Sequence, residues 1–201
     1  MKVRFGFVFS LTNLSHASLP MYVWVREREI LQDGLHLFYF AVFNSNYDIW
    51  DGASESIAPG AFTDTLGGDI RALIDHETMY VLGRNQAATL ELREDSHGLW
   101  GSILINPNDQ DAMNLYSRVQ RGDVNQCSFG FDILEEETEF RDDGSIHWTI
   151  KKVKLYEVSV CTFPAYSETS VTARKNEYDE IMKRRTDAWR AEMTRRLKGA
   201  N

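Results

Sequence analysis

The sequence predicts an α+β fold in one domain: a strand-rich core, a few short helices and a charged C-terminal helix. Its 201 residues are 43% apolar and 12% aromatic, which is enough for one hydrophobic core. Apolar runs of strand length, separated by turn residues, fill the middle of the chain. A helical period replaces them in two places, residues 106–123 and the region after Glu168.

We divide the chain into an N-terminal segment at 1–34, whose role the sequence does not indicate, a main domain at 35–173 and a basic helical tail at 174–201. The N-terminus begins like a signal peptide, but Asn13 and Ser15 interrupt its apolar run, so we do not expect secretion. We expect no membrane association, because no apolar stretch has the length needed to cross a bilayer.

The first elements of the main domain are a strand and a short helix. LHLFYFAVFNS (35–45) is an apolar run that ends in two turn-forming residues, so it predicts a buried strand. APGAFTDTLGG (58–68) has Pro59 near its start and Gly67 after its end, an order typical of a short helix.

The next elements lead into the helical segment. IRALIDHE (70–77) predicts a buried strand that runs into a charged corner, and ATLELREDSHGLWGSILI (88–105) predicts two strands around a turn. In 106–123, Ala112, Leu115, Tyr116 and Val119 follow the helical period. We expect Asn106 or Asn108 as the helix cap and Gly122 as its end.

Two long strands follow, at 124–140 and 146–163, and RDDG (141–144) is the turn between them. On the first, Cys127 alternates with the core residues Phe129 and Phe131, whereas Ser128 shares the other face with Gly130. Alternation therefore favours Ser128 over Cys127 as a nucleophile, although most serines on a strand face have no catalytic role.

A serine nucleophile requires a base. His76 ends a buried strand where the chain becomes polar, a position that can hold a side chain firmly beside a cleft. We expect the remaining histidines at the surface or, for His36, at the start of a strand. They are His16, His36, His97 and His147.

A histidine base requires an orienting group. Glu157 alternates with apolar residues along 146–163, and an inward carboxylate requires a partner, either a histidine or an arginine. Asp75 is the rival orienting group, but it is adjacent to His76, and adjacent strand side chains diverge.

Charge and motif content exclude several functions. The net charge of −8 argues against nucleic acid as the main partner. The sequence has no H-E-x-x-H, H-x-x-E-H or C-x-x-C spacing, and no phosphate-binding glycine loop, so we expect no metal and no cofactor. The two cysteines form no disulfide framework, which favours a reducing compartment.

The tail differs in charge from the rest of the chain. Between Lys183 and Lys198, seven basic residues face two acidic ones, Asp187 and Glu192. Such an asymmetry favours contact with an acidic partner, and the alternative is a solvated helix face.

Seven short segments together resemble the prohead proteases of tailed bacteriophages, the serine peptidases of capsid maturation. They span about residues 40–173 and occur in the order AVFNS, IAPGAF, IRALIDHE, VLGR, ATLELREDSHGL, RGDVNQCSFGF and LYEVSVCTFPAYSETSV. The chain departs from the family's usual pattern in having Cys127 at an apolar position and FYFAVF in place of a Gly-Tyr-Ala opening.

The resemblance implies that His76 is the base and Ser128 the nucleophile. Glu157 matches the acidic position of the L-x-E-V-S motif and is the third member of the implied triad. The resemblance also implies a barrel-like antiparallel core similar to that of the herpesvirus maturation proteases. The third member of their triad is a second histidine, and this keeps His147 as the weaker candidate. We expect the oxyanion donors in the turn at Pro164 and Ala165.

The implied function is a serine endopeptidase inside the assembling prohead in the host cytoplasm. It would cleave the scaffold segment and the extensions of the major capsid protein, and also itself. A homodimer is left open, because the herpesvirus relatives are dimers. Three alternatives remain: a non-catalytic scaffold or capsid-interior protein with this fold, a cysteine peptidase that uses Cys127, and a hydrolase of small esters without a capsid partner.

Overall fold

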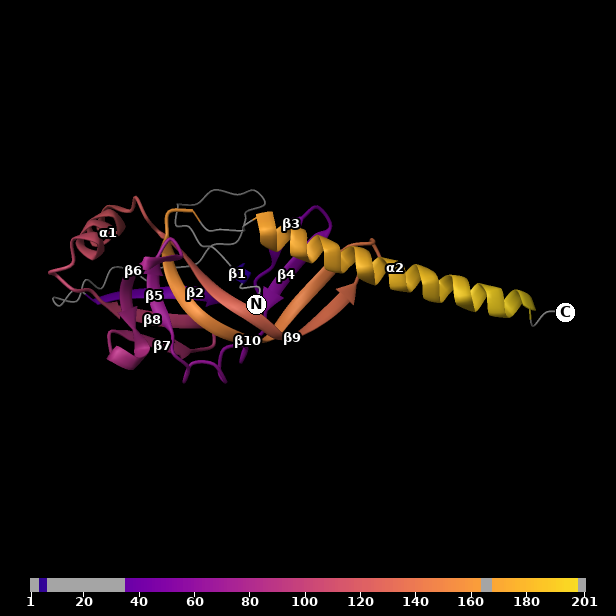
Figure 1. The fold of residues 1–201 in the computed structure, drawn as a ribbon, viewed down its shortest axis with the longest axis horizontal. Helices are drawn as coiled ribbons and strands as arrows, with labels where there is room; N and C mark the ends of the chain where they lie inside the picture. Colours follow the sequence, from indigo (N-terminus) through magenta and orange to yellow (C-terminus); the bar gives the residue numbers. More distant parts are fainter. Residues whose placement is uncertain (1–3, 7–34, 164–167, 199–201) are drawn as a thin grey trace. The chain divides into compact units, whose positions relative to one another are not determined.

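A computed structural model describes residues 4–6, 35–163 and 168–198 of the chain (Figure 1). It divides into two compact units, residues 1–165 and residues 166–201. The strand-rich α+β class is confirmed, because two sheets and two α-helices make up most of the described residues. Most of the N-terminal segment lies outside the described residues.

The larger sheet has seven strands, of which five follow the order β1-β9-β10-β4-β3, while β5 pairs with β10 and with β6. The smaller sheet has the order β2-β8-β7. The bounds in the larger sheet are β1 (Arg4–Gly6), β3 (Tyr47–Trp50), β4 (Ala53–Ile57), β5 (Arg71–Ile74), β6 (Glu77–Arg84), β9 (Gln126–Phe140) and β10 (Ile146–Cys161). Those in the smaller sheet are β2 (Leu35–Val42), β7 (Leu90–Glu94) and β8 (Gly98–Leu104).

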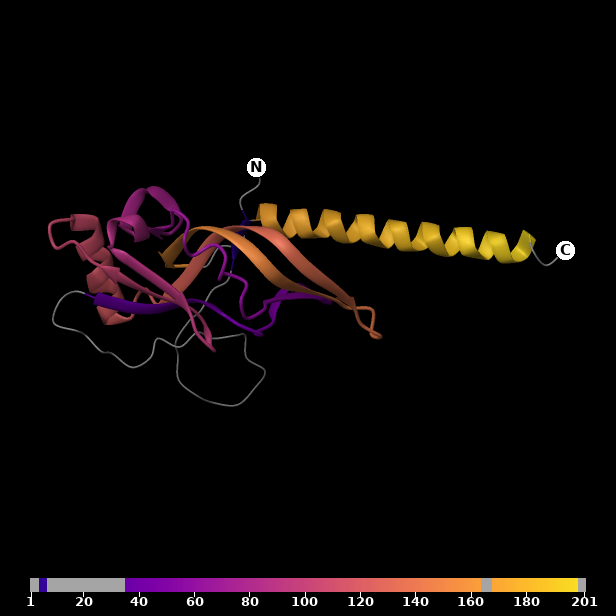
Figure 2. The ribbon, with the colours of Figure 1, turned by 90° about the horizontal axis from the view of Figure 1, so that it is seen from below.

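The antiparallel β9–β10 hairpin is the longest element of the first unit, and its two curved strands are clear in Figure 2. The predicted RDDG turn joins them, and Gly144 there has φ +85°, a conformation that favours glycine. Because β10 has 16 residues, two shorter strands pair with it at different ends. β4 runs parallel to its start and β5 runs parallel to its end.

The parallel pairs β4–β10 and β5–β10 differ from the antiparallel core that was predicted. The larger sheet is mixed, and in the described part of the chain the two sheets do not join into a closed antiparallel barrel. The apolar core includes Phe62, Phe129 and Phe131, with centroid distances of 5.3 Å and 4.8 Å between successive rings. Cys127 belongs to the same cluster, as strand alternation predicts.

Three local predictions need correction. Residues 59–67 form successive turns rather than a regular helix, and Gly60 in this stretch has φ +89°. The helix α1 (Gln110–Arg121) is capped by Asp109 and not by Asn106 or Asn108: the Asp109 side chain accepts from the backbone N–H groups of two first-turn residues. The strands β3, β4 and β6 were not anticipated. The predicted helix end at Gly122 is confirmed, with φ +86°.

The second unit contains α2 (Glu168–Lys198), a helix of 31 residues. Most of its described side chains are exposed, including Trp189 at 61%. Ion pairs one turn apart support it, for example Arg184 with Glu180 and Arg196 with Glu192. No helix in the described part of the chain is both long enough and apolar enough to span a membrane.

Candidate functional site

The turn between β5 and β6 presents His76 at the end of β10. Ile74 pairs with Glu77, so Asp75 and His76 are the two central residues of a tight hairpin turn, with φ +48° and +62°. Neither residue is glycine, so this backbone is strained, a feature often found at functional sites. Hydrogen bonds hold the turn against the end of β10: the Asp75 N–H donates to the Val160 carbonyl at 3.1 Å, and the His76 N–H donates to Ser159 Oγ at 3.2 Å. The Asp75 carboxylate also accepts from the N–H of Thr162, just after β10, at 2.8 Å.

The imidazole of His76 binds the carboxylate of Glu157. His76 Nδ1 lies 2.7 Å from Glu157 Oε1, and both side chains are about nine-tenths buried. An ionised carboxylate can only accept hydrogen bonds, so Nδ1 carries the proton and Nε2 carries the lone pair of the neutral ring. This is the tautomer that a general base requires at Nε2.

A β-bulge determines where Glu157 points. Leu155 pairs with Phe131 and Glu157 pairs with Gly130, so the register shifts at Tyr156 and alternation restarts there. Glu157 therefore lies on the face of Ser128 rather than with the core set, which corrects the orientation predicted from uninterrupted alternation.

Gly130 provides the space that the Glu157 carboxylate occupies. A Cβ atom at position 130 would lie 2.4 Å from Glu157 Oε1. The glycine therefore allows close approach, as the sequence predicted, and in the structure the approaching group is this carboxylate.

Ser128 lies directly opposite Ser159 in the β9–β10 ladder, on the same face as Glu157. Neighbouring strands are about 4.8 Å apart, so Ser128 is one strand away from the residues that hold the His76 ring. Ser128 is fully buried rather than solvated, with no exposed surface.

The two cysteines are buried near this cluster. Cys161 Sγ lies 3.9 Å from His76 Nε2, and Cys127 points into the core. Burial raises the pKa of both thiols well above the usual value. Since the thiolate is the reactive form, this argues against either cysteine as a nucleophile.

A second serine–histidine cluster lies at the other end of β10. His147 is buried, contrary to the surface position predicted for it, because β4 pairs alongside and covers it. Ser54 Oγ lies 2.8 Å from Nδ1 of this ring and Ser56 Oγ lies 2.9 Å from Nε2. Burial lowers the pKa of His147, and the nearby charge of Arg141 adds to this effect.

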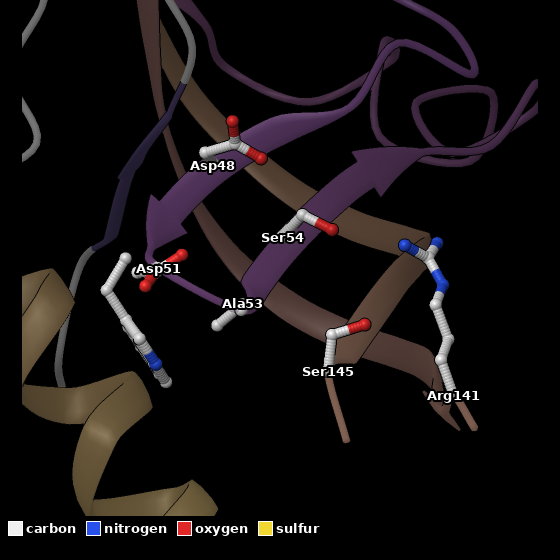
Figure 3. Close-up of a pocket in the computed structure, with 8 residues that line it drawn as sticks. Asp48, Asp51, Ala53, Ser54, Arg141 and Ser145 are labelled. Atoms are coloured by element: carbon white, nitrogen blue, oxygen red, sulfur yellow. The ribbon is translucent and has the colours of Figure 1, made fainter. Parts of the chain in front are cut away.

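Ser54 also lines a cavity of about 450 Å³, shown in Figure 3. Arg141 and Ser145 lie on one side of Ser54 in this view, and Asp48 lies on the other. The predicted triad residues are not among those that line this cavity.

The two clusters are too far apart to act together. Ser159 follows His147 by twelve positions on β10. At about 3.3 Å per residue, this separates the two by roughly 30 to 40 Å. We therefore do not retain His147 as a third member beside His76 and Ser128.

The structure thus brings two of the predicted residues, His76 and Glu157, into contact and places Ser128 on the neighbouring strand. The predicted oxyanion turn at Pro164 and Ala165 lies outside the described residues. Sequence reasoning missed Ser159, whose hydroxyl binds Glu157. Its position two residues after Glu157 in the E-V-S motif was the available signal.

Comparisons with known proteins indicate which family the chain is similar to. A family model described as "Caudovirus prohead serine protease" matches residues 24–184. The prohead protease of Enterobacteria phage HK97 is 29% identical over 149 residues, which cover 72% of this chain and 62% of that relative. The match thus spans somewhat less than two thirds of the relative's length. No solved structure matches the chain.

Proposed function

The chain belongs to the caudovirus prohead serine protease family, and from this premise we propose that it is a serine endopeptidase of phage head maturation. The observation that carries the proposal is the contact of His76 Nδ1 with Glu157 Oε1 at 2.7 Å, beside the strand that bears Ser128. A buried carboxylate–imidazole pair next to a serine is the arrangement that acyl transfer requires.

In the proposed mechanism, Ser128 Oγ attacks the scissile carbonyl carbon while His76 Nε2 takes the hydroxyl proton. Glu157 stabilises the imidazolium that forms and keeps the proton on Nδ1. The imidazolium then gives the proton from Nε2 to the leaving amine, and an acyl-enzyme remains on Ser128. Water, activated by the same Nε2, hydrolyses this ester. Because Ser128 is buried, a substrate must gain access to it before the first step.

The proposed substrates are the scaffold segment and the extensions of the major capsid protein, with the protease itself as a further substrate. The site of action is the inside of the assembling prohead in the host cytoplasm. Residues 35–173 form the proposed protease domain, and a homodimer is the oligomeric state that the herpesvirus resemblance suggests.

Co-expression with the capsid protein and its scaffold segment tests the function. Wild type should convert the capsid protein into a shorter product, and Ser128→Ala should leave it uncleaved while remaining folded. Unchanged processing by Ser128→Ala would exclude this nucleophile. A folded wild type that never cleaves the capsid protein would favour a non-catalytic scaffold role. Cleavage of small esters alone would favour a general hydrolase.

We assign the basic helix α2 a docking role. The Lys and Arg side chains of α2 whose exposure the structure describes are exposed, whereas the whole chain is acidic, so the helix is suited to bind acidic segments of the scaffold. Removal of residues 175–201 should reduce incorporation into proheads without abolishing peptide cleavage. Normal incorporation of the truncated chain would contradict this role.

A further inference from the structure

Ser159 contacts two parts of the candidate catalytic site at once. Its Oγ donates to Glu157 Oε2 at 2.5 Å and accepts from the backbone N–H of His76 at 3.2 Å. The donor roles are fixed, because a carboxylate only accepts and a backbone N–H only donates. The proton of Ser159 is therefore committed to Glu157, so Ser159 itself is not suited to act as a nucleophile.

We propose that Ser159 is a positioning residue of this site: it orients the Glu157 carboxylate and holds the strained turn that presents His76. The proposal rests on the proposed function. Glu157 uses one oxygen for His76 and the other for Ser159, so the hydroxyl fixes the rotation of the carboxylate about its last bond. The same oxygen atom of Ser159 holds the turn backbone, so the base and its orienting group share one support.

Burial increases the effect of these contacts. Ser159 has no exposed surface and Glu157 is 8% exposed, and hydrogen bonds to a charged group are stronger where water is excluded. Without the hydroxyl, Glu157 Oε2 would lose a donor inside the protein, and the turn at His76 would lose one of its bonds to β10.

The titration of His76 reports directly on this contact. Removal of a donor from the carboxylate most destabilises the state in which the imidazole is neutral and the carboxylate charge is uncompensated. We therefore expect the titration of His76 to move to higher pH in Ser159→Ala. The other titratable groups around the ring are Asp75, Cys161 and Glu157 itself. Arg71 lies opposite Glu157 on β5, and its guanidinium group binds Asp69.

The experiment is an NMR titration of the full chain labelled with ¹⁵N-histidine, combined with the rate of capsid-protein cleavage. Ser159→Ala should raise the pKa of His76 and slow cleavage about tenfold, with the active form appearing at higher pH. Ser159→Thr, which keeps the hydroxyl, should restore both quantities toward wild type. Ser102→Ala is the matched control, because Ser102 is a buried strand serine of the smaller sheet, and it should change neither.

Two further variants make the result decisive. If Ser159→Ala does not fold, Ser159→Cys keeps the volume with a weaker donor and should show a smaller rise in the pKa of His76. In a Glu157→Gln background, Ser159→Ala should slow cleavage little further, because Ser159 acts through Glu157. An unchanged His76 titration in the folded Ala or Cys variant would overturn the proposal. The titration is read without substrate, so a chain that shifts as expected but never cleaves would refute the proposed function and not this contact.

Discussion

His147 lies on strand β10 near its start, whereas His76 lies against the end of that strand, and both rings are bonded to side-chain oxygens at 2.7 to 2.9 Å. His76 binds a carboxylate from a strained turn, whereas His147 binds a serine hydroxyl at each ring nitrogen within a regular parallel ladder. A carboxylate fixes the tautomer of its partner and stabilises the charged ring. Hydroxyls accept either tautomer and do not stabilise the charged ring to the same degree.

This difference shows that a serine–histidine hydrogen bond does not by itself identify a catalytic pair. Ser54 Oγ lies 2.8 Å from His147 Nδ1, and Ser54 lines a cavity. However, burial lowers the pKa of His147, which weakens it as a base, and its other nitrogen is bonded to Ser56. His76 has the orienting carboxylate that His147 lacks.

Substitution of the two histidines, one at a time, should give the largest difference in cleavage rate. His76→Ala should reduce capsid-protein cleavage by at least about a thousandfold, because the base is lost. His147→Ala should keep most activity in whatever fraction folds. The measurement is the cleavage rate per folded molecule, with folding followed by circular dichroism. Equal losses in both variants would remove the distinction between the two clusters.

Gly130→Ala should have the next largest effect on the cleavage rate. The added Cβ displaces the flexible end of Glu157, so the fold should persist while the contact with His76 is lost. We expect a fall in cleavage of about ten- to a hundredfold with little change in melting temperature. Gly67→Ala is the matched control, because no atom lies within 4 Å of its added Cβ. Full activity in Gly130→Ala would show that the Glu157 contact is dispensable.

Cys127→Ala tests whether Cys127 packs in the core or acts as a nucleophile. Its thiol lies in the core, so the variant should keep the cleavage rate and lose about 1 to 2 kcal/mol of unfolding free energy. Chemical denaturation and the cleavage assay provide the two values. A folded but inactive variant would support the cysteine-peptidase alternative.

The smallest effect concerns the pH dependence of stability. Burial holds the pKa of His147 in the folded state below the unfolded value of about 6.5. The unfolded chain therefore binds the proton first, so this contribution to stability is complete above that pH and is lost as the pH falls below it. His147→Gln should reduce the loss of stability between neutral and mildly acidic pH, as measured by urea unfolding. An identical slope in wild type and variant would contradict the assignment.

Much of the site was predictable from local patterns. Strand alternation places Ser128 and Cys127 on opposite faces of β9, and the segment IRALIDHE places His76 at a strand end. The orientation of Glu157 was not predictable, because nothing in the sequence around Tyr156 marks a bulge, and one extra residue moves every later side chain to the other face.

The His147 cluster was missed for a different reason. Its burial depends on β4, a strand about ninety positions earlier in the chain, which pairs in parallel with β10. The alternating serines of ASESI show their role only when this non-local pairing is known. β3 and β6 were missed although they pair locally, with β4 and β5. β3 has only four residues, and the first five residues of β6 are exposed, so neither shows the apolar pattern of a strand.

The central claim is that the His76–Glu157 pair activates Ser128. The most direct measurement is peptide mapping by mass spectrometry after treatment with a fluorophosphonate, under conditions in which the chain cleaves the capsid protein. The account predicts one adduct, on Ser128, which forms more slowly in Glu157→Gln and not at all in His76→Ala. An adduct on Ser54, or inhibited cleavage with Ser128 unmodified, would contradict it.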